Sequence, residues 1–356
     1  MRHNFRQVQS LAGDAKIMCV VKGNAYGHGS IAMGQLFQEL GANYLAVAIP
    51  EEGGELRRSG VTIPILVLSA IADKQIPVCV EYDLTISVPS VEKLMAVNSY
   101  AQEHDIKVRV HIKIDTGMGR IGVHYARSEK FLDAMRACTH SIFEGIFSHF
   151  ARSDEEHDFN NEQIKRFDTV IELFADAGFT FSHIHLANSG GIIYHPNARY
   201  TMVRAGMMLY GLFKGRVVPD TLTLRPVMTW KTEVVYFKFV EKGTGIGYNH
   251  RYIAKQDTRI VTLPVGYADG YQRAMGEYGK VIINDQLYPI AGTICMDQMM
   301  IDIGRYGEAY CGDEVILVGK SAHQNISFYD IADWSDTSIY ELMSQISTRV
   351  PRIYLN

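Results

Sequence analysis

The chain has 356 residues, of which 35 are basic and 39 acidic, so its formal net charge is −4 at pH 7. At about 150 residues per domain this length predicts two domains, and 47% hydrophobic with 21% charged residues excludes a disordered or fibrous protein. The balanced charge gives no footprint for nucleic acid or for an anionic membrane surface. No apolar stretch approaches the roughly 18 residues that a spanning helix needs, and residues 1–10 carry no signal-peptide core, so this segment is expected to make no membrane contact.

Cysteine usage bears on redox compartment and on metal binding. The five cysteines are an odd number and include no Cys-x-x-Cys pair: Cys19, Cys79, Cys138, Cys295 and Cys311. This pattern predicts neither a disulfide framework nor a zinc site, and no metal is expected. A cytoplasmic location is the natural expectation, because the cytoplasm keeps thiols reduced.

Up to about Gly211, short apolar runs alternate with segments of helical period. Eight runs are predicted as strands: residues 16–21, 44–48, 64–69, 84–88, 107–114, 143–148 and 183–187, and a short one near Met202. Apolar residues at helical spacing in 33–40 and 164–174 predict two of the intervening helices. Eight such units over roughly 200 residues predict a (β/α)₈ barrel of the TIM type, an α/β fold whose active site is built from the loops that follow the strands.

After about Thr221 the pattern changes to short alternating segments separated by turn signals. Five of them are predicted as strands: residues 234–240, 258–263, 280–283, 298–303 and 314–318. The sequence therefore predicts a barrel over residues 1–215 and a mostly β second domain over residues 216–356.

A lysine follows the first predicted strand directly. Lys22 leaves a buried apolar run and enters the glycine-rich segment from Gly23 to Gly29. Partial burial there would lower its pKa and favour the neutral amine that forms Schiff bases. A lysine that only marks the end of the strand would give the same pattern.

Two glycine-containing segments follow the last two barrel strands, where phosphate sites of such barrels usually lie. They are Asn188-Ser189-Gly190-Gly191 and Arg204-Ala205-Gly206-Met207. A serine hydroxyl and free backbone N–H groups are suitable phosphate ligands. Simple turns would also explain the glycines, but their position favours phosphate binding.

Further charged residues lie at the ends of two other strands. Lys113 and Arg120 belong to the fifth strand and its loop, and His149 follows the sixth strand. Each could be an ordinary structural residue. If the barrel prediction is right, all three converge on one mouth.

Six segments in this order resemble the alanine racemase family of pyridoxal phosphate enzymes: residues 20–29, 111–123, 147–150, 187–189, 266–270 and 295–298. The resemblance spans nearly the whole chain. It implies a barrel followed by a C-terminal β domain, pyridoxal 5'-phosphate as cofactor, and a homodimer in which the partner's second domain completes each active site. It also implies racemisation of small amino acids and a supply of D-amino acids for peptidoglycan.

The resemblance assigns roles to the residues that match the family motifs. Lys22 is implied to hold the cofactor covalently, and Arg204 to face its pyridine nitrogen. A charged guanidinium there disfavours protonation of the ring nitrogen, which weakens the electron sink and suits racemisation over transamination. The implied phosphate ligands are Tyr26, Ser189, Gly206 and Met207.

Racemisation needs proton transfer on both faces of the substrate Cα. The resemblance implies Lys22 for one face and Tyr267 of the partner subunit for the other, with His149 assisting the tyrosine. Arg120 and the backbone of Met296 are implied to bind the substrate carboxylate. Lys113 lies at a position that is often carbamylated in the family, where the new carboxylate orients the arginine.

The chain departs from the family pattern at three places. Thr348 stands where a tyrosine usually lines the substrate entrance, which predicts a larger pocket and racemisation of serine as well as alanine, as in the serine racemases of vancomycin-resistance clusters. A neighbouring aromatic ring could instead refill the space. Thr293 replaces an arginine of the outer entrance. The chain also begins without the short strand that family members have, which suggests a domain of a longer, membrane-anchored chain, although another start site would look identical.

Two other functions stay open at this point. A fold-related pyridoxal phosphate amino-acid decarboxylase would share the lysine and the β domain, but such enzymes carry an acidic partner for the pyridine nitrogen, and Arg204 argues against one. A non-catalytic pyridoxal phosphate carrier normally ends after the barrel, whereas roughly 140 residues follow here.

Overall fold

The computed structural model describes residues 1–213 and 219–355. They form two compact units: Met1–Ala25 with Gly29–Val227, and Tyr26–His28 with Met228–Asn356. The predicted boundary between residues 215 and 216 lies outside the described residues. Among those residues, no helix combines the length and the apolar character that crossing a bilayer requires.

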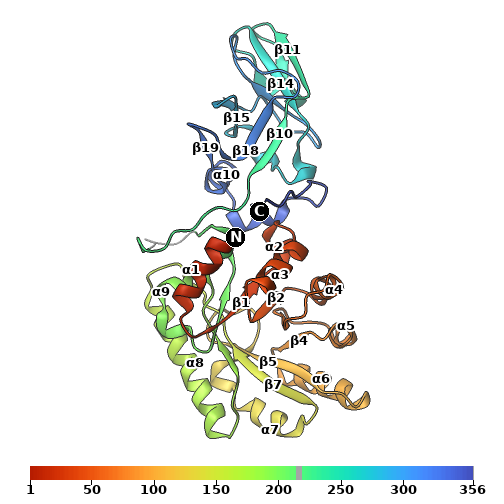
Figure 1. Cartoon of the computed structure of the whole chain (residues 1–356), viewed down its shortest axis with the longest axis vertical. Coiled ribbons are helices and arrows are strands. Elements are labelled where there is room, and N and C mark those ends of the chain that lie inside the picture. Colours follow the sequence, from red (N-terminus) through yellow and green to blue (C-terminus); the bar gives the residue numbers. More distant parts are fainter. Residues whose placement is uncertain (214–218, 356) are drawn as a thin grey trace. The chain divides into compact units, whose positions relative to one another are not determined.

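The first unit is a nearly closed barrel of eight parallel strands, as predicted (Figure 1). Its strands are β1 (Lys16–Val20), β2 (Tyr44–Val47), β3 (Ile65–Val67), β4 (Thr85–Val88), β5 (Val108–Asp115), β7 (Ser141–Phe147), β8 (His183–His185) and β9 (Met202–Ala205). They pair in the order β8-β7-β5-β4-β3-β2-β1-β9, and the two-residue strand β6 (Val123–His124) pairs in parallel with the end of β5. The chain order of the strands therefore brings their carboxyl ends to one mouth.

The strands are apolar because the barrel buries both of their faces. Every residue of β2, β3 and β4 is buried, including Thr85 and Ser87. Continuous burial of this kind is typical of parallel strands, whose side chains fill the barrel interior on one face and pack under helices on the other.

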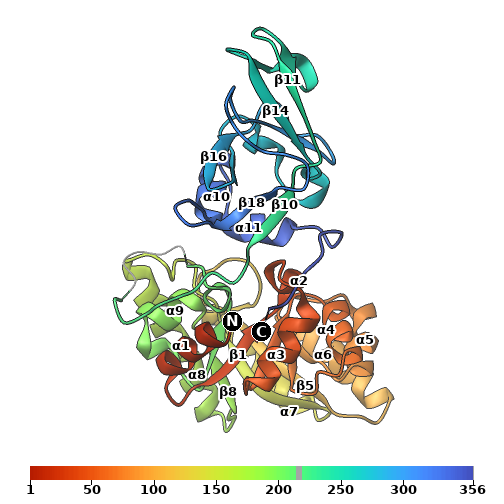
Figure 2. The ribbon, with the colours of Figure 1, turned by 45° about the horizontal axis from the view of Figure 1, so that its top comes forward.

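Helices surround these strands (Figure 2). They are α1 (Arg2–Ala12), α3 (Ser30–Glu39), α4 (Pro50–Arg58), α5 (Ile76–Glu81), α6 (Val91–Glu103), α7 (Lys130–Ala137), α8 (Asp158–Asp176) and α9 (Ser189–Tyr194). The two predicted helical stripes lie in α3, which buries Met33 and Phe37, and in α8, which buries Ile164 and Phe167. Their apolar faces are the inner faces of the helical layer.

The sequence analysis missed α1, which an apolar stripe and one buried amide hold in place. Phe5 stacks on Phe37 with 6.2 Å between ring centroids. The Asn4 side chain donates to the carbonyls of Leu209 at 3.0 Å and Arg225 at 2.8 Å.

The second unit is mostly antiparallel β structure, as predicted. The five predicted segments correspond to β11 (Tyr236–Val240), β14 (Thr258–Leu263), β15 (Lys280–Ile283), β17 (Met299–Asp302) and β18 (Glu314–Lys320). The structure adds β10 (Trp230–Glu233), β12 (Gly245–Ile246), β13 (Tyr252–Ile253), β16 (Gln286–Pro289), β19 (Asn325–Ile326), α10 (Phe328–Ser335) and α11 (Ile339–Gln345). Helix α10 begins at a capping box in which Ser327 accepts from the Asp330 N–H and the Asp330 carboxylate accepts from Ser327.

Candidate active site

Four predicted cations lie at the carboxyl end of the barrel. Lys22 follows β1, Arg204 lies in β9, and Lys113 and Arg120 belong to β5 and its loop. Arg120 and Arg204 both lower the pKa of Lys22 and the pKa of Lys113, so the four side chains are within electrostatic reach of one another. The structure therefore brings together residues that lie as much as 182 positions apart in the sequence.

A left-handed turn fixes the backbone directly after Lys22. In α2 (Lys22–Tyr26), Gly23, Asn24 and Ala25 have φ angles of 62°, 52° and 53°, so this segment is not a right-handed helix. The Gly23 N–H donates to Glu52 Oε1 at 2.7 Å, and Asn24 Oδ1 accepts from the Ser30 N–H at 2.9 Å. Left-handed conformation costs roughly 1–2 kcal/mol for each non-glycine residue. These side-chain contacts offset that cost and hold the lysine at a fixed exit from the strand.

The surroundings of Lys22 favour its neutral amine. Burial lowers its pKa most, Arg120 lowers it further, and the Glu52 carboxylate opposes them. A neutral amine is the nucleophilic form of lysine. Lys22 can therefore attack a carbonyl group closer to neutral pH than an exposed lysine can.

Arg204 is the most completely bonded side chain of the site. It is only 3% exposed. Its Nη1 donates to Nδ1 and to the carbonyl of His185, both at 2.9 Å. Its Nη2 contacts the carbonyls of Ser148 at 2.8 Å and Leu186 at 3.0 Å, and His149 Nδ1 at 3.0 Å. Within the described part of the chain, Nε makes no such bond, so this nitrogen alone can serve a ligand.

The Arg204 guanidinium stays charged although it is buried. Burial and the nearby Arg120 lower its pKa to about 9. That value is still above neutral pH, and the carbonyl oxygens around the guanidinium accept its protons. Arg204 is therefore a fixed positive charge in the barrel mouth.

His149 takes up a defined tautomer beside Arg204. Arginine only donates hydrogen bonds, so His149 Nδ1 must accept, and the proton of the neutral ring lies on Nε2. Burial lowers the pKa of His149 well below its ordinary value, and Arg204 and Lys113 lower it further. The ring is therefore neutral and offers one N–H donor.

Lys113 is buried without a counter-charge of its own. Its Nζ lies 4.6 Å from the centroid of the Phe147 ring, and it has no hydrogen bond or ion pair within the described residues. Burial lowers its pKa most strongly, followed by Arg204 and Arg120, and only Asp115 opposes them. The surroundings of Lys113 therefore favour its neutral, nucleophilic amine.

The predicted phosphate segments lie side by side. Asn188 caps α9 by accepting from the Gly191 N–H at 3.1 Å. Ser189 Oγ accepts from the Gly206 N–H at 3.2 Å and from the Met208 N–H at 3.4 Å. Met207 begins the short 3₁₀ helix Met207–Tyr210. The structure thus brings Ser189 and Gly206 into contact, and the Gly206 N–H donates to the Ser189 hydroxyl oxygen.

The second unit carries the other predicted residues, and two of its motifs pair with each other. The Tyr267 N–H donates to the Cys295 carbonyl at 3.1 Å, and the Ala268 N–H donates to the Met296 carbonyl at 3.0 Å. Gly266 is required at this junction, because a Cβ there would lie 2.3 Å from the Cys295 oxygen. The Tyr267 and Met296 residues are 44% and 54% exposed, so both project from the surface of their unit.

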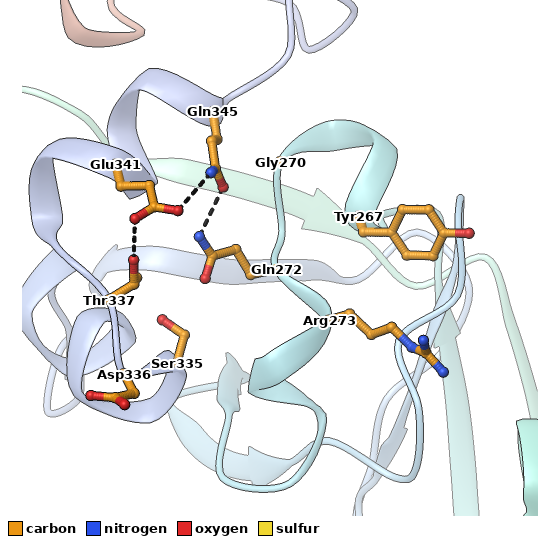
Figure 3. A pocket seen from close by; sticks show the side chains of 9 residues that line it. All are labelled: Tyr267, Gly270, Gln272, Arg273, Ser335, Asp336, Thr337, Glu341 and Gln345. Atoms are coloured by element: carbon orange, nitrogen blue, oxygen red, sulfur yellow. Dashed lines mark hydrogen bonds between the residues drawn. The ribbon is translucent and has the colours of Figure 1, made fainter.

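Tyr267 also lies at the edge of a cavity of about 660 Å³ within the second unit (Figure 3). Polar side chains of α10, α11 and the loop after Tyr267 line it: Gln272, Arg273, Ser335, Asp336, Thr337, Glu341 and Gln345. Gln345 bridges Gln272 at 2.8 Å and Glu341 at 3.0 Å. The Tyr267 ring points away from these amides, so its hydroxyl is not used by them.

Tyr26 and Thr348 belong to the second unit as well. The Tyr26 ring lies 6.4 Å from that of Tyr340, and burial, with a smaller contribution from Tyr340, raises the pKa of its phenol. Thr348 is exposed in the turn after α11. Its neighbour Arg349 is held by Asp269, with 2.6 Å between Nε and Oδ1.

Sequence reasoning missed three residues behind Arg204. His185 and His111 continue its hydrogen bonds, and Glu144 lies at ion-pair distance from His111, 3.5 Å between Oε2 and Nε2. An ionisable residue inside an otherwise apolar strand was the available signal. Burying such a residue is costly unless it is paired.

Comparisons with known proteins cover both units. The family models described as "Alanine racemase, N-terminal domain" and "Alanine racemase, C-terminal domain" match residues 1–214 and 227–354. The chain belongs to the alanine racemase family. The alanine racemase of Halothermothrix orenii is 42% identical to it over 358 residues, which cover 100% of this chain and 94% of that protein.

Solved structures agree with this assignment to the alanine racemase family. An alanine racemase from Clostridium difficile 630 is 35% identical and superposes with a TM-score of 0.93, covering 98% of this chain and 91% of that one. A histidine racemase from Leuconostoc mesenteroides subsp. sake is 28% identical with a TM-score of 0.91, covering 100% and 95%. The alanine racemase fold is therefore also that of a protein named for a larger amino acid.

Proposed function

We propose that the chain is a pyridoxal phosphate-dependent racemase that interconverts L- and D-alanine. Family membership supports the reaction class, and one observation supports the chemistry. A lysine with a lowered pKa and an arginine with one uncommitted donor lie at the same barrel mouth. The substrate is that of the named relatives.

The residues of the first unit fit the cofactor. Arg120 and the charged Arg204 give the mouth positive charge, which suits an anionic phosphorylated ligand. Lys22 would hold the aldehyde covalently, and Ser189 with the backbone of Gly206 and Met207, together with Tyr26, would hold the phosphate. When bound, pyridoxal phosphate withdraws electrons from the substrate Cα and makes its proton acidic.

Arg204 would face the pyridine nitrogen through its free Nε–H. Because the guanidinium stays charged at neutral pH, it disfavours a proton on that nitrogen. Arg204 therefore limits electron withdrawal by the ring. This favours return of a proton to Cα, the racemase outcome, over transfer elsewhere.

Two bases would act on opposite faces of Cα. Lys22 would hold or release a proton at Nζ on one face, and Tyr267 of the partner subunit would do so at its hydroxyl on the other. The exposure of Tyr267 and Met296 supports a homodimer with shared sites, since both project from their unit. The His149 Nε2–H would donate to the tyrosine oxygen and help it to hold negative charge.

Arg120 and the Met296 backbone would bind the substrate carboxylate. We also propose that Lys113 is carbamylated: its neutral amine attacks carbon dioxide, an N–C bond forms and one proton leaves. The product is an anion near Arg204 and Arg120, and its negative charge compensates the two guanidinium groups. It could orient Arg120 as the resemblance implies.

Serine is a proposed second substrate. Thr348 is exposed and carries no ring. At the entrance, where the resemblance places it, such a residue would leave room for a hydroxymethyl group. The similarity to a histidine racemase supports tolerance of larger side chains on this fold. The five free cysteines, all among the described residues, suit a reducing cytoplasm, where D-amino acids would be supplied for peptidoglycan.

The decisive experiment is chiral analysis of the products formed from L-alanine and L-serine by the purified protein with pyridoxal phosphate. We expect both enantiomers of each amino acid, with the cofactor trapped on Lys22 by borohydride. Release of carbon dioxide instead would indicate a decarboxylase. Cofactor binding without exchange of the Cα hydrogen in heavy water would indicate a carrier.

A further inference from the structure

A row of buried polar side chains runs from Arg204 through the barrel interior. Arg204 Nη1 donates to His185 Nδ1 at 2.9 Å, His185 Nε2 lies 2.9 Å from His111 Nδ1, and His111 Nε2 lies 3.5 Å from Glu144 Oε2. The four residues come from β9, β8, β5 and β7. We call them the buried polar row.

Most of the row has no access to water. His185 and His111 are fully buried, and the Glu144 side chain is 21% exposed. Buried polar groups must satisfy each other, so every proton position in the row matters to the next member. His185 also stacks on Phe147 with 4.8 Å between ring centroids and 5° between ring planes, which fixes the plane of its ring.

As long as the charged Arg204 keeps its hydrogen bond to His185 Nδ1, the protons of the row have one order. A guanidinium has no acceptor, so His185 Nδ1 must accept and its Nε2 must carry the proton. That Nε2–H then donates to His111 Nδ1. The His111 proton consequently lies on Nε2, which has no hydrogen bond within the described residues but lies 3.5 Å from Glu144 Oε2, an ion-pair distance.

The opposite order would damage the site. If His111 donated from Nδ1 to His185 Nε2, the His185 proton would move to Nδ1 and face an N–H of Arg204 at 2.9 Å. Two donors at that distance repel each other. The guanidinium would have to move away from its present hydrogen-bond partners.

Glu144 decides between the two orders. Its Oε2 accepts from the Tyr44 hydroxyl at 2.7 Å, and its Oε1 lies 3.6 Å from His183 Nε2. Burial by itself raises the pKa of Glu144, but hydrogen bonds from His111, His183 and Tyr44 together lower it, so the group is a carboxylate. A carboxylate accepts and cannot donate, which favours a proton on His111 Nε2.

We propose that Glu144 is a positioning residue that fixes the tautomers of His111 and His185 and thereby holds the charged Arg204 in place. The proposal rests on the proposed function in one respect, namely that Arg204 faces the pyridine nitrogen. Outer partners of this kind commonly set which nitrogen of a histidine carries the proton. In this protein the influence of Glu144 on Arg204 would pass through the rings of His111 and His185.

The direct test is ¹⁵N NMR of the full-length protein with histidine labelled at both ring nitrogens and pyridoxal phosphate bound. In the wild type, His185 and His111 should each show a protonated Nε2 and an unprotonated Nδ1. In Glu144→Gln, either order can be accommodated, because an amide offers both a donor and an acceptor. Mixed tautomers are therefore expected at both histidines.

Tyr44→Phe is the matched control. It also removes a hydrogen bond from the Glu144 carboxylate, but it leaves the carboxylate facing His111. Its histidine tautomers should equal those of the wild type. If Glu144→Gln does not fold, Glu144→Asp keeps the charge and should retain the wild-type order.

A second measurement follows the fate of the cofactor during turnover. A displaced Arg204 would disfavour protonation of the ring nitrogen less strongly, so side transamination should become more frequent in Glu144→Gln. The number of side transaminations per racemisation, followed by the loss of cofactor absorbance, should rise about tenfold. A change of this size is within the range that loss of an orienting partner costs at metal sites. Tyr44→Phe should keep the wild-type ratio.

The outcomes separate the two proposals. A wild type with the His185 proton on Nδ1, or a Glu144→Gln variant with unchanged tautomers, overturns the role of Glu144 even in an active racemase. Ordered tautomers in a protein that racemises no amino acid overturn the proposed function alone.

Discussion

The two units place their candidate residues in opposite environments. In the barrel, Arg204 is almost fully buried and each of its terminal nitrogens is bonded, whereas in the second unit Tyr267 and Met296 lie on the surface. Buried, interlocked groups can form a rigid binding site within one chain. Exposed groups gain defined partners only when something docks on them. This difference supports a site in which the barrel supplies the cofactor pocket and a second subunit supplies the remaining acid–base group.

The largest effect is expected from removing a residue of the barrel. Lys22→Ala removes the amine that would hold the cofactor and transfer a proton, so kcat should fall by at least about 10³-fold. Borohydride should no longer trap cofactor on the protein. Lys16→Ala, an exposed lysine at the start of the same strand β1, is the control and should keep both properties. Full activity of Lys22→Ala would contradict the assignment.

A smaller effect on racemisation is expected from the exposed tyrosine of the second unit. Tyr267→Phe should lower racemisation by about 10²- to 10³-fold, the usual value of a general acid–base group, while cofactor binding stays intact. Chiral product analysis and cofactor absorbance measure the two effects separately.

Mixing two inactive variants tests whether the site is shared. In a hybrid dimer of Lys22→Ala and Tyr267→Phe chains, one site would combine an intact lysine with an intact tyrosine. Refolding the variants together at equal amounts should restore about a quarter of the wild-type activity if subunits pair at random. Recovery of no activity from a mixture proven to contain hybrid dimers would mean that both residues act within one chain.

Substrate choice gives a third, more modest effect in the second unit. Thr348→Tyr fills the entrance with a ring, so the ratio of kcat/KM for L-serine to that for L-alanine should fall about tenfold, since a small group is worth roughly 1–3 kcal/mol in a fitted pocket. Thr348→Ser keeps the room and should leave the ratio unchanged. An unchanged ratio in Thr348→Tyr would remove the basis for serine as a substrate.

The smallest expected effect is a shift in pH dependence at the barrel mouth. Burial and then Arg120 lower the pKa of Lys22, so the amine is neutral at lower pH than an exposed lysine. Arg120→Ala should raise the pKa of Lys22, and borohydride-trapped cofactor should then require higher pH. Arg127→Ala, an exposed arginine of the same loop region, is the control. A pH profile that moves downwards or stays fixed in Arg120→Ala would contradict the electrostatic account.

The prediction of elements succeeded where local pattern and burial coincide. Strands such as β2 and β3 are continuous apolar runs bounded by polar segments, and both helical stripes are long enough to show their period. Helix α1 was missed because its polar face dominates a short sequence and its stability depends on Phe37 and on a distant backbone. Strand β10 was missed because its partner is β18, far along the chain.

The sequence by itself determined the fold class, the order of the motifs and the identity of the residues at the strand ends, because alternating strands and helices allow few ways of burying their apolar faces. Only the tertiary structure decided the left-handed turn after Lys22, the lowered pKa values and the contacts that run from Arg204 to Glu144. These properties depend on distance, burial and hydrogen bonding between side chains from different strands. Such contacts are not encoded in the spacing of residues along the chain.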